Sequence, residues 1–268
     1  MIVVNQAPPP ESDPRLGAGE ILRILGLPSD DAEVRRRVGT FIVCNGYAGV
    51  HEAARYTARR KASHKITEPW GYTVRVYNGN IARLSTLYVL THLAESGLRS
   101  QADVAYRATN GSTWHRFPDT YLTGREVNAF QQETKNLLTW EQRPGQRGMQ
   151  VVRPDEPAAF LELVAMGWLK QIVLNAHGRN ARSILVHPKD GITQGAQARH
   201  LLQAVVDTRN NVAHNRLVRN EEYSAAIRDL LPLLHTLQFD TAKTLDNIEG
   251  ERRKHMDALL QALRKPTM

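Results

Sequence analysis

The sequence predicts a mainly α-helical protein, and three observations support this prediction. Apolar residues recur at helical spacing over residues 81–95, 158–176, 196–216 and 240–263. Helix-start signals precede several of these stretches. Only short segments alternate between apolar and polar residues in the way that β-strands do. We therefore expect a helical bundle with a less regular N-terminal or inserted region that contains one or two short strands.

Composition limits the class of protein further. The chain has 268 residues, 41% of them apolar, which is enough for one large domain or two modest ones. It has no apolar run of about 18 residues, the length that a membrane-spanning helix needs. The start lacks the basic and apolar regions of a signal peptide. With Cys44 as the single cysteine, we expect a cytoplasmic protein without disulfides and with no membrane partner.

We expect three parts along the chain. Residues 1–15 are rich in proline and predict a mobile tail. Residues 16–150 predict an N-terminal helical region that could contribute the first helix of the bundle. A loop with several Pro, Gly and Arg residues ends this region, and residues 151–268 predict a helical domain.

The N-terminal region has mixed patterns. A short helix is expected at 20–25, and Ser29 can cap a longer one that either runs to about residue 60 or breaks at Asn45-Gly46 into a hairpin. Alternation at 73–77, followed by Asn78-Gly79, predicts a short strand. Helices are then expected at 81–96, at 100–109 and at 123–140, the last two starting with capping boxes, and a short strand at 149–152.

The C-terminal patterns are clearer. Pro157 stands in the first turn of an apolar helix expected at 158–176. After the helix at 196–216, Asn220 can cap a leucine-rich helix that Pro232 must kink or end. The last helix is expected at 240–263.

The helix at 196–216 carries the candidate site. Seven of its apolar residues share one face, and Arg209 falls near the middle of that face. A guanidinium keeps its charge, so it needs a partner or an anion there. Asn210 and His214 lie one turn apart on the flank. The apolar residues are Ala198, Leu201, Leu202, Val205, Val206, Val212 and Ala213.

The run Arg209-Asn210-x-x-x-His214 after an apolar helix resembles the signature of the HEPN superfamily. The resemblance covers about twenty residues. It implies an all-α bundle in which two copies meet as a homodimer and form a metal-independent ribonuclease site on RNA. Arg59 with His64 and Arg182 with His187 have the same separation, but neither pair lies on an amphipathic helix.

The chemistry of these side chains suits RNA cleavage. His214 would act as acid or base, because an unperturbed imidazole titrates near neutrality. Arg209 would hold the phosphate with its planar fork of donors, and Asn210 would orient it. His200 and Asp207, on the same flank, would support His214. The resemblance implies 2′,3′-cyclic phosphate and 5′-hydroxyl ends, no metal and no cofactor, and a toxin or defence effector that an antitoxin or activator protein controls.

The charge favours a polyanionic partner. The net charge is +8 and the pI is near 9.8. Arg252, Arg253 and Lys254 form a basic run that is either a solvated helix face or a contact to the RNA backbone. An aromatic content of 6% argues against a stacking platform for single strands.

Two other interpretations remain. In the first, Arg209 pairs with a buried carboxylate, for example from 221–229, and His214 caps its helix, so the domain is a non-catalytic dimerisation or partner-binding module. In the second, residues 81–116 bind nucleic acid as a regulator. The stretch 110–118 would be a poor recognition helix, because Gly and Pro bound it.

Overall fold

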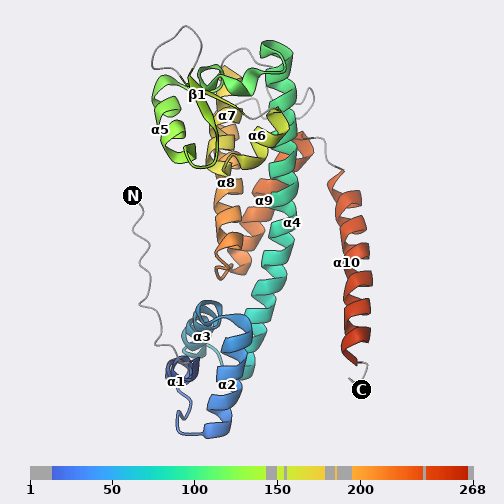
Figure 1. Ribbon diagram of the computed structural model, residues 1–268. Coiled ribbons are helices and arrows are strands. Elements are labelled where there is room, and N and C mark those ends of the chain that lie inside the picture. The colour runs from blue at the N-terminus through green and yellow to red at the C-terminus, as the bar shows by residue number, and fades with distance from the viewer. Residues whose placement is uncertain are drawn as a thin grey trace. The chain divides into compact units, whose positions relative to one another are not determined.

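The chain is mainly α-helical, as predicted (Figure 1). In the described part, ten α-helices and two short 3₁₀ helices accompany one two-stranded sheet. They form two compact units, residues 1–88 with 210–223 and residues 89–209 with 224–268. The boundary expected near residue 150 falls inside the second unit. The computed structural model describes residues 14–142, 150–153, 156–178, 185, 195–237 and 240–264.

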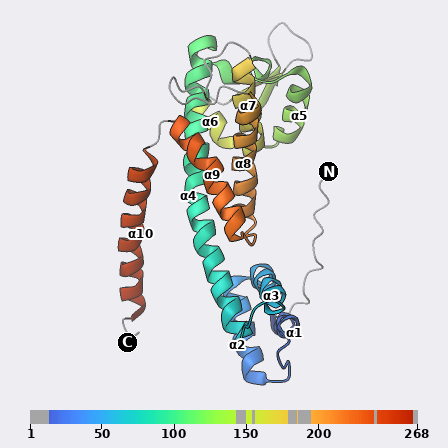
Figure 2. The ribbon, with the colours of Figure 1, turned by 180° about the vertical axis from the view of Figure 1, so that it is seen from behind.

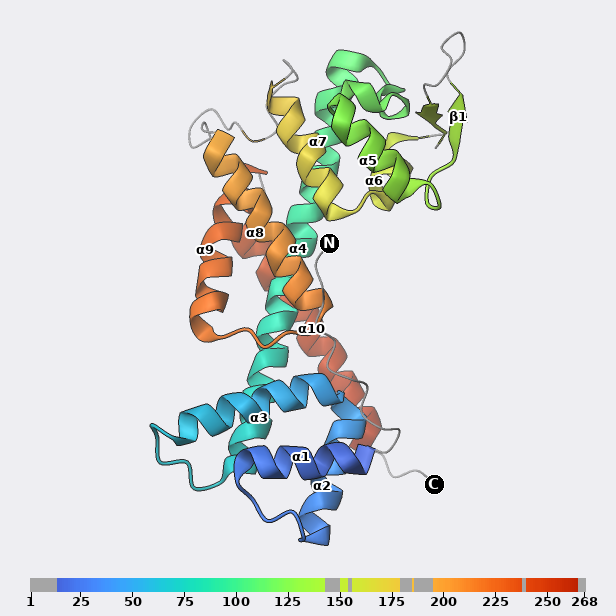
Figure 3. The ribbon, with the colours of Figure 1, turned by 90° about the vertical axis from the view of Figure 1, so that its left-hand side faces the viewer.

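The first unit packs three helices on the start of a long one. Helices α1 (Pro14–Leu25), α2 (Ala32–Asn45) and α3 (Tyr47–Lys61) precede α4 (Pro69–Asn110). Figure 3 shows α1 beside both α2 and α3. The core of this unit consists of Ala18, Ile21, Leu22, Leu25, Val38, Ile42, Val50, Ala53, Ala54 and Tyr77.

Helices α2 and α3 are separated by the single residue Gly46, and the chain does not form a β-hairpin there. Gly46 adopts φ +83°, a conformation that disfavours other residues, and its amide donates to the Ile42 carbonyl at 2.8 Å. Asp31, rather than Ser29, caps α2, because its carboxylate accepts from the amides of Glu33 and Val34 at 3.0 Å. The expected tail, residues 1–15, lies almost wholly outside the described residues.

The strand expected at 73–77 is wrong. These residues lie in α4, where Thr73, Tyr77 and Asn80 are buried at helical spacing. The Thr73 hydroxyl donates to the Pro69 carbonyl, and the Tyr77 hydroxyl donates to the carbonyl of Asn45. The alternation was a local coincidence over five residues, and packing of one helical face decided the structure.

The two helices expected at 81–96 and 100–109 are one continuous helix. Helix α4 runs through Ser100 without a cap. After it, Trp114 and His115 lie in a short 3₁₀ helix (Trp114–Arg116) and are each 1% exposed. The stretch 110–118 therefore does not form a recognition helix, as predicted.

The helix expected at 123–140 is shorter. Thr123 and Glu126 form the predicted capping box, but α5 (Gly124–Thr134) ends early. The chain then forms β1 (Trp140–Gln142), which pairs antiparallel with β2 (Gln150–Val152), the strand predicted at 149–152. Trp140 faces Val152 across this pair.

A cluster of aromatic side chains forms one part of the core of the second unit. Tyr106 stacks on Trp114 with ring centroids 4.7 Å apart, and Tyr121 meets Trp114 edge to face. The polar ends have partners: Trp114 Nε1 donates to Asp103 Oδ1 at 2.9 Å, and the Tyr106 hydroxyl donates to the Ile172 carbonyl at 2.8 Å. Phe160 packs on the same group.

The helix expected at 158–176 is two helices. Pro157 starts α6 (Pro157–Leu163), Val164 adopts an extended conformation, and α7 (Met166–Gly178) follows. Helices α8 (Gly195–Ala213), α9 (Asn220–Thr236) and α10 (Thr241–Arg264) lie close to their predicted positions. Pro232 does not end α9. Figure 2 shows α8 and α9 running beside α4 within this unit.

Candidate functional site

Helix α8 presents the candidate residues at its C-terminal end. Arg209 and Asn210 lie in its last two turns, and His214 follows Ala213 directly. The His214 amide donates to the Asn210 carbonyl at 3.0 Å. Asn215 then adopts φ +52°, and the amides of Asn215 and Arg216 donate to the carbonyls of Val212 and Asn211. This is a Schellman motif, and it fixes the backbone that carries His214.

The buried face of α8 stops before the motif. Ala198, Leu201, Leu202 and Val205 are buried as predicted, and Thr208 joins them. Val206 and Val212 are half-buried, however, and Ala213 is exposed. Arg209 is therefore not in the middle of a buried face, because the apolar face that surrounds it in the sequence is only partly covered in the single chain.

Arg209 has an acidic partner. Its Nε donates to Oε2 of Glu95 on α4 at 3.3 Å, and this is its one side-chain hydrogen bond to a described residue. Glu95 also binds Arg99 one turn further along α4. Arg99 is additionally anchored, since both its terminal nitrogens donate to the Val164 carbonyl. One carboxylate thus serves two guanidiniums, and the cluster keeps a net positive charge.

The exposures of the two partners differ. The Arg209 side chain is 46% exposed and that of Glu95 only 16% exposed. The pairing expected from the alternative interpretation is therefore present, but the acid comes from α4 and not from residues 221–229. Sequence reasoning missed Glu95 and Arg99, because nothing in the sequence of residues 81–99 distinguishes these two charges from ordinary surface residues.

Asn210 and His214 are free to contact a ligand. Both are exposed, and neither side chain makes a hydrogen bond or an ion pair with the described residues. The boundary between the two units falls between Arg209 and Asn210. The three residues nevertheless follow one another along a single helix and its cap, so the helix itself sets their order.

His200 and Asp207 have other partners. His200 Nε2 lies 3.6 Å from Oδ2 of Asp229 on α9. Asp207 Oδ1 accepts from Gln203 Nε2 at 2.8 Å. The first contact links α8 to α9 and the second lies within α8, and neither supports the predicted role beside His214.

The basic run on α10 is offset by nearby acids. Arg252 and Arg253 both bind Glu249, and Lys254 binds Glu251. The hydrogen bonds from the two arginines lower the pKa of Glu249 to about 2. The run is therefore an exposed helix face on which Glu249 and Glu251 offset part of the positive charge.

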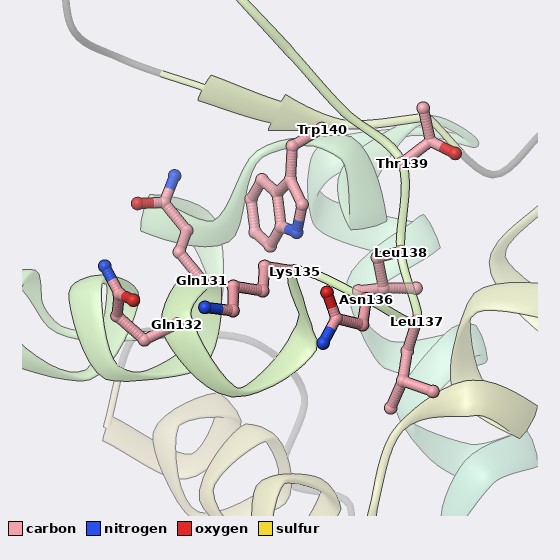
Figure 4. A pocket seen from close by; sticks show the side chains of 8 residues that line it. All are labelled: Gln131, Gln132, Lys135, Asn136, Leu137, Leu138, Thr139 and Trp140. Atoms are coloured by element: carbon pink, nitrogen blue, oxygen red, sulfur yellow. The ribbon is translucent and has the colours of Figure 1, made fainter.

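A cavity of about 720 Å³ lies between α5 and β1 (Figure 4). Amide side chains, Lys135 and the ring of Trp140 line it, and the motif residues do not. Among the described residues, no group of three or more His, Cys, Asp or Glu could hold a metal ion. No described helix is long and apolar enough to cross a membrane.

The fold and site so far define an α-helical protein with an exposed Arg-Asn-His motif. Comparison of the chain with protein-family models, curated proteins and solved structures finds no match.

Proposed function

We propose that the chain is a metal-independent endoribonuclease of the HEPN type that acts as a homodimer. The exposure of Arg209, Asn210 and His214 at the end of α8 supports this most directly. The Asn210 amide and the His214 imidazole have no partner among the described residues, so a ligand can reach both without breaking a hydrogen bond within this part of the chain. Side chains kept free on an ordered helix end suit contact with a ligand.

The three side chains supply the required chemistry. His214 takes the proton from the 2′-hydroxyl or gives one to the leaving 5′-oxygen. Arg209 stabilises the charge on the phosphate, and Asn210 orients it. The cleavage leaves a 2′,3′-cyclic phosphate and a 5′-hydroxyl.

The ion pair with Glu95 is compatible with this role. It uses Nε of Arg209 and leaves both terminal nitrogens without a described partner. A planar guanidinium held at one edge can still bind two phosphate oxygens through the other edge. Glu95 then orients the side chain, as a carboxylate behind a phosphate-binding arginine does.

A second copy of the chain completes the site in this proposal. One motif gives one histidine, whereas the reaction needs both an acid and a base. Val212 and Ala213 leave apolar surface beside the motif, which a two-fold related copy could cover. We further propose that the protein is a cytoplasmic toxin or defence effector, which an antitoxin restrains or an activator protein triggers.

The test is cleavage of total RNA in EDTA by the dimeric protein and by two variants, Arg209→Ala and His214→Ala. Cleavage should persist with the chelator and disappear in both variants. New 5′ ends should accept phosphate from a polynucleotide kinase without prior dephosphorylation. His200→Ala is the matched control, since His200 lies on the same helix with a partner on α9. Unchanged cleavage in either motif variant would refute the proposal.

The second candidate is a non-catalytic dimerisation module, which the Arg209–Glu95 pair favours. Intact dimers in sedimentation experiments without any RNA cleavage would support it.

A further inference from the structure

A pocket of about 230 Å³ in the first unit concentrates positive charge. Helices α3 and α4 and the α8–α9 connection contribute to its walls, and Figure 3 shows these segments. Among the described residues that line it, Glu221 is the one acid. The side chains that give the pocket its character are four arginines and two tyrosines, Arg60, Arg75, Arg83, Arg219, Tyr56 and Tyr72.

The four arginines lack acidic partners. None of them makes an ion pair within the described part of the chain, whereas Arg36, Arg107 and Arg252 each bind an acid three or four residues away. Like charges that share a pocket repel one another unless an anion joins them. Arg37, Arg55 and Arg59 likewise make no ion pair with a described residue. The pocket is therefore distinguished by four such arginines that share one lining.

One wall of the pocket is held in place. Asn80 is 3% exposed; its amide nitrogen donates to the Arg216 carbonyl at 3.1 Å, and its oxygen accepts from the Val218 amide at 2.8 Å. Arg83 donates through Nε to the Val218 carbonyl and through Nη1 to Asn220 Oδ1. The α8–α9 connection thus has a fixed conformation before a ligand arrives, which lowers the entropic cost of binding.

Aromatic rings lie beside the charges. Tyr56 and Tyr72 are half-buried in the pocket lining. The Arg75 guanidinium lies 5.7 Å from the centre of the Tyr72 ring. Arginines next to an aromatic ring suit a nucleotide, because the arginines can bind its phosphate and the ring can stack on its base.

We propose that this pocket binds one nucleotide of a single-stranded RNA, with its phosphate on the arginines and its base against a tyrosine. The volume is below the roughly 300 Å³ of ordinary small-molecule pockets, so it suits one unit of a longer strand. The choice of RNA rests on the proposed function, because Leu217, the first lining residue of the α8–α9 connection, lies three residues after His214 and in the same unit.

The test measures binding of a fluorescent oligonucleotide of 2′-O-methyl RNA at several salt concentrations. This probe has no 2′-hydroxyl and cannot be cleaved by the proposed reaction. The variant is Arg75→Gln with Arg219→Gln, since neither side chain holds the backbone. The control is Arg36→Gln with Arg55→Gln, which removes the same charge from the same unit outside the pocket.

We expect the pocket variant to bind about tenfold more weakly and the control to bind as the parent does. Loss of two phosphate contacts should also reduce the slope of log Kd against log salt by about 1.4. Thermal melting checks that both variants fold. Equal weakening in the control, or no weakening in the pocket variant, would overturn the proposal, and so would displacement of the strand by AMP at equal concentration.

The outcomes for cleavage and for binding are separable. RNA cleavage with unchanged binding by the pocket variant refutes the pocket alone. Pocket-dependent binding without cleavage of total RNA refutes the ribonuclease alone.

Discussion

Nε of Arg209 on α8 donates to Oε2 of Glu95 on α4 across 3.3 Å, and the same carboxylate binds Arg99. The two arginines are not equivalent. Arg209 is 46% exposed with one described hydrogen bond, whereas Arg99 is 18% exposed and also anchors a carbonyl. We infer that Arg99 serves the fold and that Arg209 is largely available for another task.

Replacement of these arginines should separate stability from activity. Arg209→Ala should lower the free energy of unfolding by less than about 1 kcal/mol, since half-exposed ion pairs contribute little. Arg99→Ala should cost roughly 2–3 kcal/mol, because it leaves the Val164 carbonyl without its two guanidinium donors and the largely buried Glu95 with Arg209 as its one described ion-pair partner. Urea unfolding measures both. A larger loss for Arg209→Ala would mean that this residue is structural.

Glu95→Gln should strengthen RNA binding while it weakens the fold. The substitution removes the one negative charge from the cluster with Arg99 and Arg209. Affinity for 2′-O-methyl RNA should rise severalfold at low salt, and the difference should shrink at high salt because ions screen exposed charges. Weaker binding in a folded variant would instead show that Glu95 must orient Arg209.

Asn80→Ala should loosen the α8–α9 connection. The buried amide satisfies the Val218 amide and the Arg216 carbonyl, so its removal should cost roughly 1–3 kcal/mol. Hydrogen exchange should accelerate most at the Val218 amide. Asn78→Ala is a suitable control, since Asn78 is exposed on the same helix. Unchanged exchange at Val218 would contradict this account of the connection.

The buried tyrosines should make the folded protein less stable at alkaline pH. Burial raises the pKa of Tyr121 and of Tyr77, and burial with a hydrogen bond to Glu20 raises that of Tyr47. A folded state with a raised pKa holds its protons longer than the unfolded chain. The stability from these groups is therefore complete below pH about 10 and falls as pH rises through their folded pKa values.

Near-ultraviolet absorbance of tyrosinate tests this expectation. In the folded protein, fewer than the eight tyrosines should ionise near pH 10, and the rest should follow only as the fold is lost. In urea, all eight should titrate together. Tyr121→Phe should reduce the loss of stability at high pH, and simultaneous titration in the native protein would disprove the prediction.

The sequence predicted helices best where one apolar face was long and regular. The positions of α8 and α10 followed from periodicity, and the capping box of Thr123 and Glu126 was visible as residue types. The prediction from sequence failed where tertiary packing overrode a short local pattern. Residues 73–77 alternate, yet Thr73 and Tyr77 face the helical core of the first unit.

For the candidate site, sequence could locate Arg209, Asn210 and His214 but not their surroundings. Glu95 and Arg99 lie more than a hundred residues earlier, and only the packing of α4 on α8 brings them to Arg209. The arginine pocket was equally hidden, because its four cations come from three separate segments. Pairing between distant residues leaves no periodic trace in one sequence.

The left-handed backbone at Asn215 limits which residues can follow the motif. Asparagine and glycine tolerate this conformation, whereas a β-branched side chain strains it. In a library randomised at position 215, selection for folded molecules should therefore enrich Asn and Gly and deplete Val, Ile and Thr. The backbone conformation thus constrains which residues can occupy position 215, whatever substrate His214 binds.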